Sequence, residues 1–174
     1  VVLMGNSEVV WYLHNMADQM TNYYKNAEGD ECLLVHDGAG TLESMFGNVS
    51  FYPGDYLVIP RGTIYRLVFD KLPVRMIAIE SHGPIEVPKR YRNEYGQLLE
   101  HAPYYERDIR PPSELVTHDE SGKFGIVVKA RGRLTRYAYR FNPLDVVGWD
   151  GIVYPWAFSI HDFYPIVGKL HIPP

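Results

Sequence analysis

Histidines and carboxylates supply most of the chemistry that this sequence could perform, and several of them stand in small clusters. The pair His161-Asp162 lies ten residues before His171, so the three side chains suggest a metal site of two histidines and one carboxylate. A continuous strand would place the two histidines on one face, but Pro165 and Gly168 interrupt this segment. Adjacent residues of a strand also point to opposite faces. We therefore expect no metal site from these three residues.

The other histidines favour structural roles. His118-Asp119-Glu120 precedes Ser121-Gly122 and predicts a solvated polar turn. His101 and Glu106 lie near a proline turn, where hydrogen bonds to the backbone are expected. The remaining three are expected to be structural or surface residues: His14, His36 and His82.

No nucleophilic or nucleotide-binding motif is present in the sequence. The candidate serines lack the Gly-x-Ser-x-Gly pattern of a nucleophile elbow: Ser113, Ser121 and Ser159. Cys32 is surrounded by leucine and valine and is expected to be a small apolar core residue. A single cysteine excludes a disulfide framework and a cysteine-built zinc site. Walker and Rossmann glycine patterns are also absent.

The charge distribution argues against nucleic acid as a partner. The 174 residues have a formal net charge of −4, and eight acids against Lys25 give the first 60 residues −7. The densest basic stretch, 89–92, lies among Glu86, Glu94 and Glu100 and predicts a mixed solvated face. No apolar run approaches the roughly 20 residues of a membrane span, so we expect a soluble cytoplasmic protein without membrane contact.

Short runs rich in valine, isoleucine and aromatic residues predict β-strands that would position these side chains. Turn residues separate the runs, and their short, regular spacing favours an all-β sandwich or barrel over a βαβ sheet. Gly47-Asn48 is a hairpin signal, and at most one short helix is expected, around residues 93–100. The predicted strands are 9–13, 31–36, 41–46, 49–52, 56–60, 64–69, 75–81, 124–130, 134–141, 152–160 and 166–171.

A proline- and charge-rich stretch divides these strands into two groups. We expect a β-barrel over residues 1–85, a connector over 86–120, and the opening strands of a second β-domain over 121–174.

The spacing of turn residues in the first group resembles that of cupins, small double-sheet β-barrels of the jelly-roll type. Glu31 is followed by Gly38, and Gly54 begins a Gly-x5-Pro-x-Gly pattern that ends at Pro60 and Gly62. The glycines allow tight turns, and a proline at a strand end costs no ladder hydrogen bond. The resemblance implies an all-β, cupin-like double-sheet barrel.

The cupin resemblance also implies where a metal would be bound. Two histidines would stand just before Glu31 and one three residues after Gly62, but residues 24–27 hold none and residue 65 is Tyr65. One carboxylate does not hold a divalent transition metal. We therefore expect no metal or cofactor in this barrel, and Glu31 to be an ordinary polar residue near its mouth.

Longer motifs in order along the whole chain resemble the homogentisate 1,2-dioxygenase family, in particular its short bacterial form. They are Asn26–Glu31, Val35–Leu42, Gly54–Gly62, Pro88–Asn93, Gly96–His101, Val146–Gly151, Phe158–Phe163 and Leu170–Pro174.

This resemblance implies an enzyme of tyrosine and phenylalanine catabolism that uses O2 to convert homogentisate into maleylacetoacetate. It implies two cupin-like parts, a metal-free first barrel and a second part that binds Fe(II) through two histidines and a glutamate downstream of residue 174. It also implies trimers that pair. His171 matches a family histidine that contacts a ring hydroxyl of the substrate and acts in proton transfer, a role that suits a pKa near neutrality. Capping of a strand is the structural alternative for His171.

Other functions remain open on the sequence. The main alternative is a non-catalytic cupin module that binds a small ligand or mediates oligomerisation. A cupin sugar isomerase is less favoured, because the histidines expected inside the barrel are missing. Aromatic patches around Tyr104-Tyr105 and Trp149–Trp156 predict core packing, with subunit contacts as the alternative.

Overall fold

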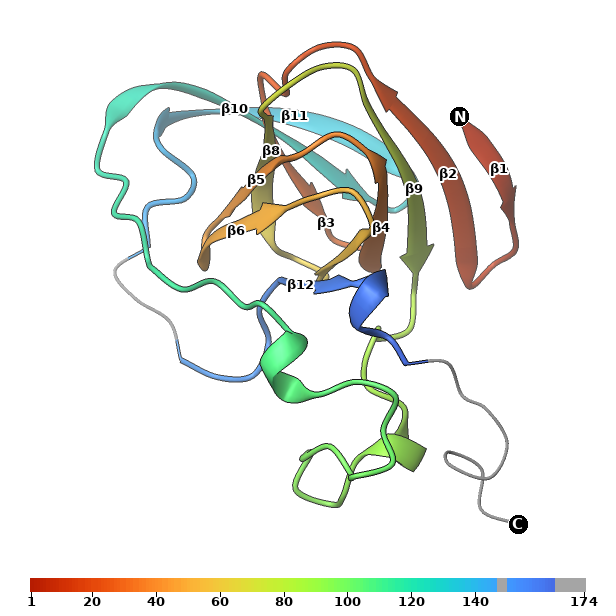
Figure 1. Cartoon of the computed structure of the whole chain (residues 1–174). Coiled ribbons are helices and arrows are strands. Elements are labelled where there is room, and N and C mark those ends of the chain that lie inside the picture. The colour runs from red at the N-terminus through yellow and green to blue at the C-terminus, as the bar shows by residue number, and fades with distance from the viewer. Residues whose placement is uncertain (147–149, 165–174) are drawn as a thin grey trace.

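Two six-stranded sheets build the molecule (Figure 1), and the computed structural model describes residues 1–146 and 150–164. In spatial order, the first sheet consists of β1 (Val2–Gly5), β2 (Val9–Met16), β9 (Val74–Ser81), β4 (Asp30–Asp37), β7 (Asp55–Ile59) and β12 (Trp156–Ser159). The second consists of β11 (Arg133–Phe141), β10 (Ser121–Ala130), β3 (Tyr23–Asn26), β8 (Ile64–Phe69), β5 (Gly40–Ser44) and β6 (Gly47–Phe51).

The pairing of the strands confirms an all-β, cupin-like double-sheet barrel. Consecutive strands repeatedly change sheets: β4 pairs with β7 and β9, whereas β5, the next strand along the chain, pairs with β6 and β8. Gly38 lies at this crossover with a φ of 100°, and a Cβ there would come within 2.6 Å of Val74. This position therefore requires glycine. The described strand pairs are antiparallel except β3 with β10.

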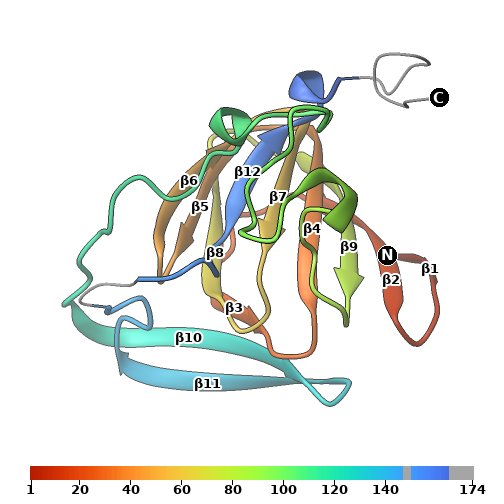
Figure 2. The same ribbon diagram turned by 90° about the horizontal axis from the view of Figure 1, so that it is seen from below.

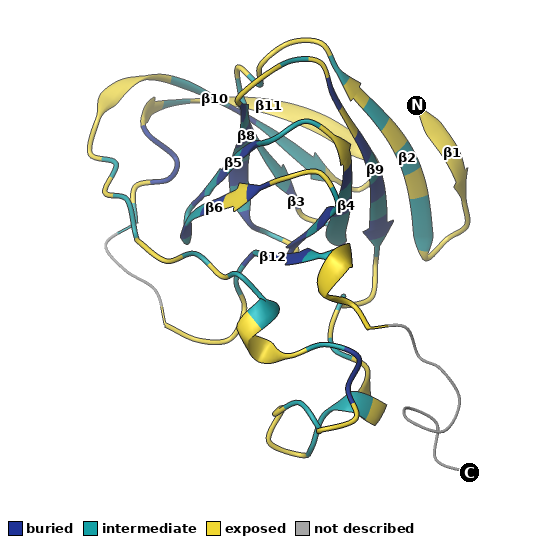
Figure 3. Cartoon of the chain, in the orientation of Figure 1, coloured by how far each residue is buried: buried dark blue, intermediate teal, exposed yellow. Residues whose placement is uncertain are grey.

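The core lies between the sheets and is built mainly by alternate residues of β4 to β9 (Figure 3). In β4, Leu33 and Val35 point into the core, and in β9 Met76 and Ala78 do so. Phe51 and Phe69 pack edge to face with ring centroids 6.3 Å apart. The edge strands β1 and β11 are mostly exposed.

Most of the strands expected in the described residues are present, with differences of a few residues at their ends. β1 and β3 were not expected, and the hairpin between β5 and β6 turns at Met45-Phe46 instead of Gly47-Asn48. At most one short helix was expected around residues 93–100, and none forms there. Asn93 accepts hydrogen bonds from the amides of Tyr95 and Gln97, and Gly96 has a φ of 84°, so the chain turns there.

The strands after residue 120 join the sheets of the first barrel. β10 pairs with β3, and Figure 2 shows β10 and β11 as a long ribbon along one side of the barrel. β12 pairs with β7 and is an edge strand of the other sheet. The expected strand 166–171 lies outside the described residues, and the expected division at residues 85 and 120 stays a prediction.

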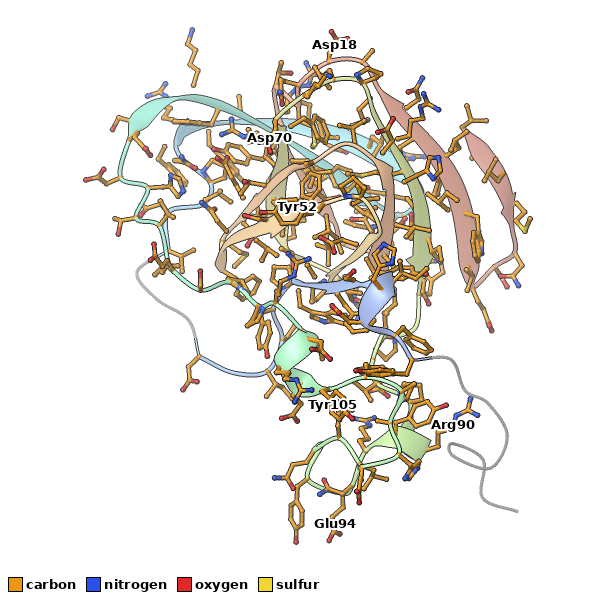
Figure 4. All side chains as sticks on the ribbon, in the orientation of Figure 1. Asp18, Tyr52, Asp70, Arg90, Glu94 and Tyr105 are labelled. Atoms are coloured by element: carbon orange, nitrogen blue, oxygen red, sulfur yellow. The ribbon has the colours of Figure 1, made fainter. Side chains whose placement is uncertain are left out.

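The connector runs over the barrel with little regular structure. It contains two 3-10 turns, Lys89–Tyr91 and Glu106–Asp108, and a third follows β12 at Ile160–Asp162. Figure 4 shows Arg90, Glu94 and Tyr105 on this part of the chain, away from the strands. Within residues 1–146 and 150–164, no helix is long and apolar enough to cross a membrane.

Candidate functional site: a cavity inside the barrel

A cavity of about 410 Å³ lies between the two sheets. β2, β4 and β9 line it from one side, and β3, β8, β10 and Leu134 of β11 from the other. Much of its wall is apolar and rich in methionine: Met16, Met20, Leu33, Leu67, Met76 and Ala78.

A carboxyl group and two phenols form one polar part of the wall. The Tyr65 hydroxyl donates a hydrogen bond of 3.0 Å to Glu31 Oε2. The Tyr24 ring meets the Tyr65 ring edge-on, with centroids 5.6 Å apart. All three residues line the cavity, and Glu31 is half-buried there because it alternates along β4 with the inward-facing Leu33 and Val35.

The surroundings of Glu31 change its acidity. Burial raises the pKa of its carboxyl from 4.5 to about 7, although hydrogen bonds from Tyr65 and Asn26 act in the opposite direction. Asn26 is buried, and its side-chain oxygen accepts the amides of Glu28 and Gly29. Its Nδ2 lies beside the Glu31 carboxyl without a well-formed hydrogen bond.

An ion pair forms a second polar part of the wall. Lys129 of β10 is bonded to Glu80 Oε2 of β9, and its Nζ lies 3.4 Å from the Tyr12 hydroxyl. Tyr12 donates to the same Glu80 oxygen over 3.3 Å. Burial opposes the charge of Lys129, but the hydrogen bonds and charges of Glu80 and Tyr12 together outweigh it, so the pKa of the ammonium group is raised. Lys129 is thus a neutralised cation rather than a free one.

His14 completes the polar lining. It follows Tyr12 on the inner face of β2, with ring centroids 6.0 Å apart. Burial, and next the charge of the N-terminus, lower the pKa of its imidazole, which favours the neutral form.

The structure brings together three positions that the cupin spacing identified, Tyr24, Glu31 and Tyr65. Glu31, expected to be a polar residue near the barrel mouth, and His14, expected to be a structural or surface residue, both line the cavity and are half-buried. Sequence reasoning missed Tyr12, Glu80 and Lys129. The alternation of Met76, Ala78 and Glu80 in β9 would have signalled an inward Glu80, but nothing in the sequence indicates that β10 brings Lys129 beside it.

The other candidate clusters lie outside this cavity. His161 and Asp162 are exposed in the last 3-10 turn, and their suggested partner His171 lies outside the described residues. His101 Nε2 lies 3.1 Å from the Arg90 carbonyl, which confirms the expected backbone bond.

The cluster after the connector is held by a buried amide. Asn142 Nδ2 lies 3.2 Å from His118 Nδ1 and donates to Glu120 over 3.1 Å. Asp119 and Glu120 are exposed, as expected of a solvated cluster, whereas His118 is half-buried beside the buried Asn142.

The cavity residues do not fit a divalent metal. In the described part of the chain, no three histidine, cysteine, aspartate or glutamate side chains are grouped as metal ligands would be. Burial raises the pKa of the phenols of Tyr24 and Tyr65 well above the usual value, so both stay protonated. Glu31, with two neutral phenols, lacks the imidazole donors that Fe(II) prefers.

Comparison with known proteins gives a consistent relationship over most of the chain. The model of the family described as homogentisate 1,2-dioxygenase N-terminal matches residues 4–160. The protein named "Putative dioxygenase SSO1533", from Saccharolobus solfataricus, is 49% identical over 152 residues, covering 87% of this chain and 39% of that protein. A homogentisate 1,2-dioxygenase of Bradyrhizobium diazoefficiens is 28% identical over 153 residues, covering 87% of this chain and 32% of the relative. The chain thus spans about a third to two fifths of the length of these relatives.

Two of the solved structures that resemble this chain are cupin proteins. A cupin 2 conserved barrel domain protein from Leptotrichia buccalis has a TM-score of 0.43 at 13% identity, covering 91% of this chain and 81% of that one. A cupin-2 domain containing protein from Shewanella frigidimarina has a TM-score of 0.41 at 20% identity, covering 47% and 78%.

Proposed function

This chain belongs to the homogentisate 1,2-dioxygenase N-terminal family, and from that membership we propose that it is the structural barrel of an Fe(II)-dependent enzyme that opens the ring of homogentisate with O2. The match of the family model to residues 4–160 is the observation on which this proposal rests. The relationship to dioxygenases extends to the more similar Saccharolobus protein. Homogentisate as the substrate, and tyrosine and phenylalanine catabolism as the pathway, are part of the proposal.

The barrel acts as a scaffold in this proposal, because its inward residues do not fit iron. Fe(II) held by two histidines and a carboxylate would offer open positions for O2 and a phenolic substrate. The proposed ligands lie beyond residue 174, in the part of the relatives that this chain does not span. In this proposal the contribution of the barrel to catalysis is structural, through the stable packing of its two sheets.

His171 is proposed as the residue of this chain that meets the substrate. An imidazole near its ordinary pKa can accept the proton of a ring hydroxyl as the phenol becomes a better electron donor. This role comes from the family resemblance of Leu170–Pro174, since His171 lies outside the described residues. A cytoplasmic, trimer-based homo-oligomer is proposed on the same ground.

Oxygen uptake by the product of the complete open reading frame, loaded with Fe(II), tests the proposal. We expect rapid O2 consumption with homogentisate and much slower consumption with its isomers bearing hydroxyl groups at other ring positions. Uptake with another dihydroxylated acid but not with homogentisate would overturn homogentisate as the substrate, while the proposal of a dioxygenase would stand. No uptake with any of these acids would overturn both.

A second candidate is the non-catalytic cupin module, and the cavity between the sheets specifically favours it. A module of this kind would bind a small molecule without consuming O2. The oxygen-uptake measurement therefore separates the two candidates.

A further inference from the structure

Polar groups without partners line the cavity. The Tyr24 hydroxyl and the His14 imidazole face it, and neither is hydrogen-bonded within the part of the chain that the structure describes. Asn26, which is 2% exposed, has its Nδ2 directed at the Glu31 carboxyl without a well-formed hydrogen bond. Tyr24 and His14 are only partly buried, so a ligand that enters the cavity can reach their unused hydrogen-bonding groups.

The charges around the cavity select against an anion. Lys129 is the cation of the lining, and Glu80 already neutralises it, with Glu28 Oε2 4.0 Å away on the other side. Glu31 adds a further carboxyl group. A carboxylate ligand would therefore lose its hydration without gaining an unpaired positive partner.

The size and the wall of the cavity suit a single substituted ring. An apolar cavity of about 150 Å³ already accommodates benzene, so about 410 Å³ leaves room for one ring with substituents. The thioethers of Met16, Met20 and Met76 can contact the edge of such a ring. Met20 is held in place, because its sulfur lies 3.4 Å from the Leu67 amide nitrogen.

We infer that the interior of this barrel binds a small uncharged phenol, whose hydroxyl accepts a hydrogen bond from Tyr24 and donates one to Glu31. The methionine- and leucine-rich wall surrounds its ring. A phenol matches the pair because it is both donor and acceptor, and because it is uncharged at pH 7, since phenols ionise near pH 10. The inference does not depend on the dioxygenase proposal, because its readout is binding and not O2 consumption.

Isothermal titration of the iron-free product of the complete open reading frame tests the inference. The probes are 4-methylphenol, toluene and 4-methylbenzoate, which share a ring and a methyl group. We expect saturable, one-to-one binding of 4-methylphenol. Binding of 4-methylbenzoate should be at least about tenfold weaker, because its carboxylate would be buried without a positive partner. Toluene should bind roughly threefold to tenfold more weakly than 4-methylphenol, since it forms neither hydrogen bond.

Variants locate the binding in the barrel. Tyr24→Phe keeps the ring and removes the hydroxyl, so 4-methylphenol should bind roughly threefold to tenfold more weakly while toluene binds as before. Ala78→Phe fills the cavity and should abolish both. Tyr95→Phe is the matched control, because Tyr95 is 80% exposed in the connector.

Three results would overturn the inference. They are no saturable binding of 4-methylphenol, equal or tighter binding of 4-methylbenzoate, and 4-methylphenol binding that Tyr24→Phe leaves unchanged. The last result would place the phenol elsewhere in the protein. Thermal unfolding of each variant accompanies the titrations, and Tyr24→Phe decides the outcome if Ala78→Phe does not fold.

Discussion

Glu31 is the residue at which sequence pattern and structure diverge most. Its position in the cupin spacing suggested a polar residue near the barrel mouth, whereas strand alternation places its carboxyl inside the barrel, bonded to Tyr65. Burial raises the pKa of this carboxyl to about 7. Glu31 is therefore partly protonated at neutral pH, and the stability of the fold should depend on its titration.

The first prediction concerns this pH dependence. The folded-state pKa of Glu31 lies above the ordinary value of 4.5, so the folded state binds more protons than the unfolded state between the two values. The free energy of unfolding should then fall as pH rises from about 4.5 to about 7, by at most about 3 kcal/mol. Glu31→Gln cannot titrate and should lack this decrease. Urea unfolding at a series of pH values measures the difference.

Glu94→Gln provides the control for this experiment. Glu94 is exposed on the connector, away from the cavity (Figure 4), so this variant should follow the wild-type curve. Parallel curves for the wild-type protein and Glu31→Gln would show that Glu31 titrates normally and is not buried as described.

His171 gives the second prediction at this scale. In the product of the complete open reading frame, His171→Gln should lower kcat for homogentisate by about 10²- to 10⁴-fold, the usual contribution of general acid–base catalysis. Steady-state oxygen uptake over a pH range measures kcat and KM separately. His36→Gln, at an exposed position of β4, is the control. An unchanged kcat in His171→Gln would leave only the strand-capping role.

At the scale of elements, one arginine attaches the connector to the barrel. The Arg110 guanidinium is bonded to Asp55 Oδ2 at the start of β7, and the Asp55 side chain is 3% exposed. Asp55 also accepts the Tyr52 amide over 2.8 Å, and the backbone of Arg110 pairs with Ala157 of β12. One residue therefore joins the connector, a turn of the first barrel and the last described strand.

Arg110→Met should be strongly destabilising for this reason. The change leaves the buried Asp55 carboxylate without its cation, which should lower the free energy of unfolding by about 2 kcal/mol. Urea unfolding measures the loss, and limited proteolysis should cut the connector faster. Arg107→Met, at a side chain that is 74% exposed, should change neither. Equal stability of the two variants would show that the Arg110–Asp55 pair does not anchor the connector.

Most strands could be predicted from the sequence because their signals are local. Strands such as 64–69 are visible from composition and turn residues, and β8 has these bounds. β3 was missed because Tyr23–Asn26 is short and polar, and it is a strand through pairing with β8 and β10. The cupin spacing pointed to residues 24–27, Glu31 and Tyr65 as the positions where a metal would be bound, and Tyr24, Glu31 and Tyr65 all line the cavity. The Lys129–Glu80 pair depends on a parallel contact between distant segments, which periodicity does not encode.

At the scale of the whole molecule, the two sheets pack together and include strands from both predicted domains. Family membership relates this unit to dioxygenases, while the inward residues at the cupin metal positions do not fit iron. We therefore propose that this chain provides a structural barrel and that the iron chemistry lies in the remainder of the enzyme.

Iron titration tests this separation. We predict that the 174-residue chain binds no Fe(II) stoichiometrically, whereas the product of the complete open reading frame binds one Fe(II) per subunit. Metal analysis after anaerobic loading and desalting measures both. Stoichiometric iron in this chain that is lost in Glu31→Gln would contradict the account, since it would make Glu31 a ligand.

Labelling with ¹⁸O2 tests the central claim most directly. The iron-loaded enzyme from the complete open reading frame is supplied with homogentisate under ¹⁸O2. The ring-opened compound is reduced with borohydride at once, so that its keto oxygen does not exchange with water, and is then analysed by mass spectrometry. Ring cleavage by a dioxygenase predicts that both labelled oxygen atoms enter one ring-opened molecule. Incorporation of one atom, with the other released as water, or no incorporation at all, would contradict the claim that this barrel belongs to a ring-cleaving homogentisate dioxygenase.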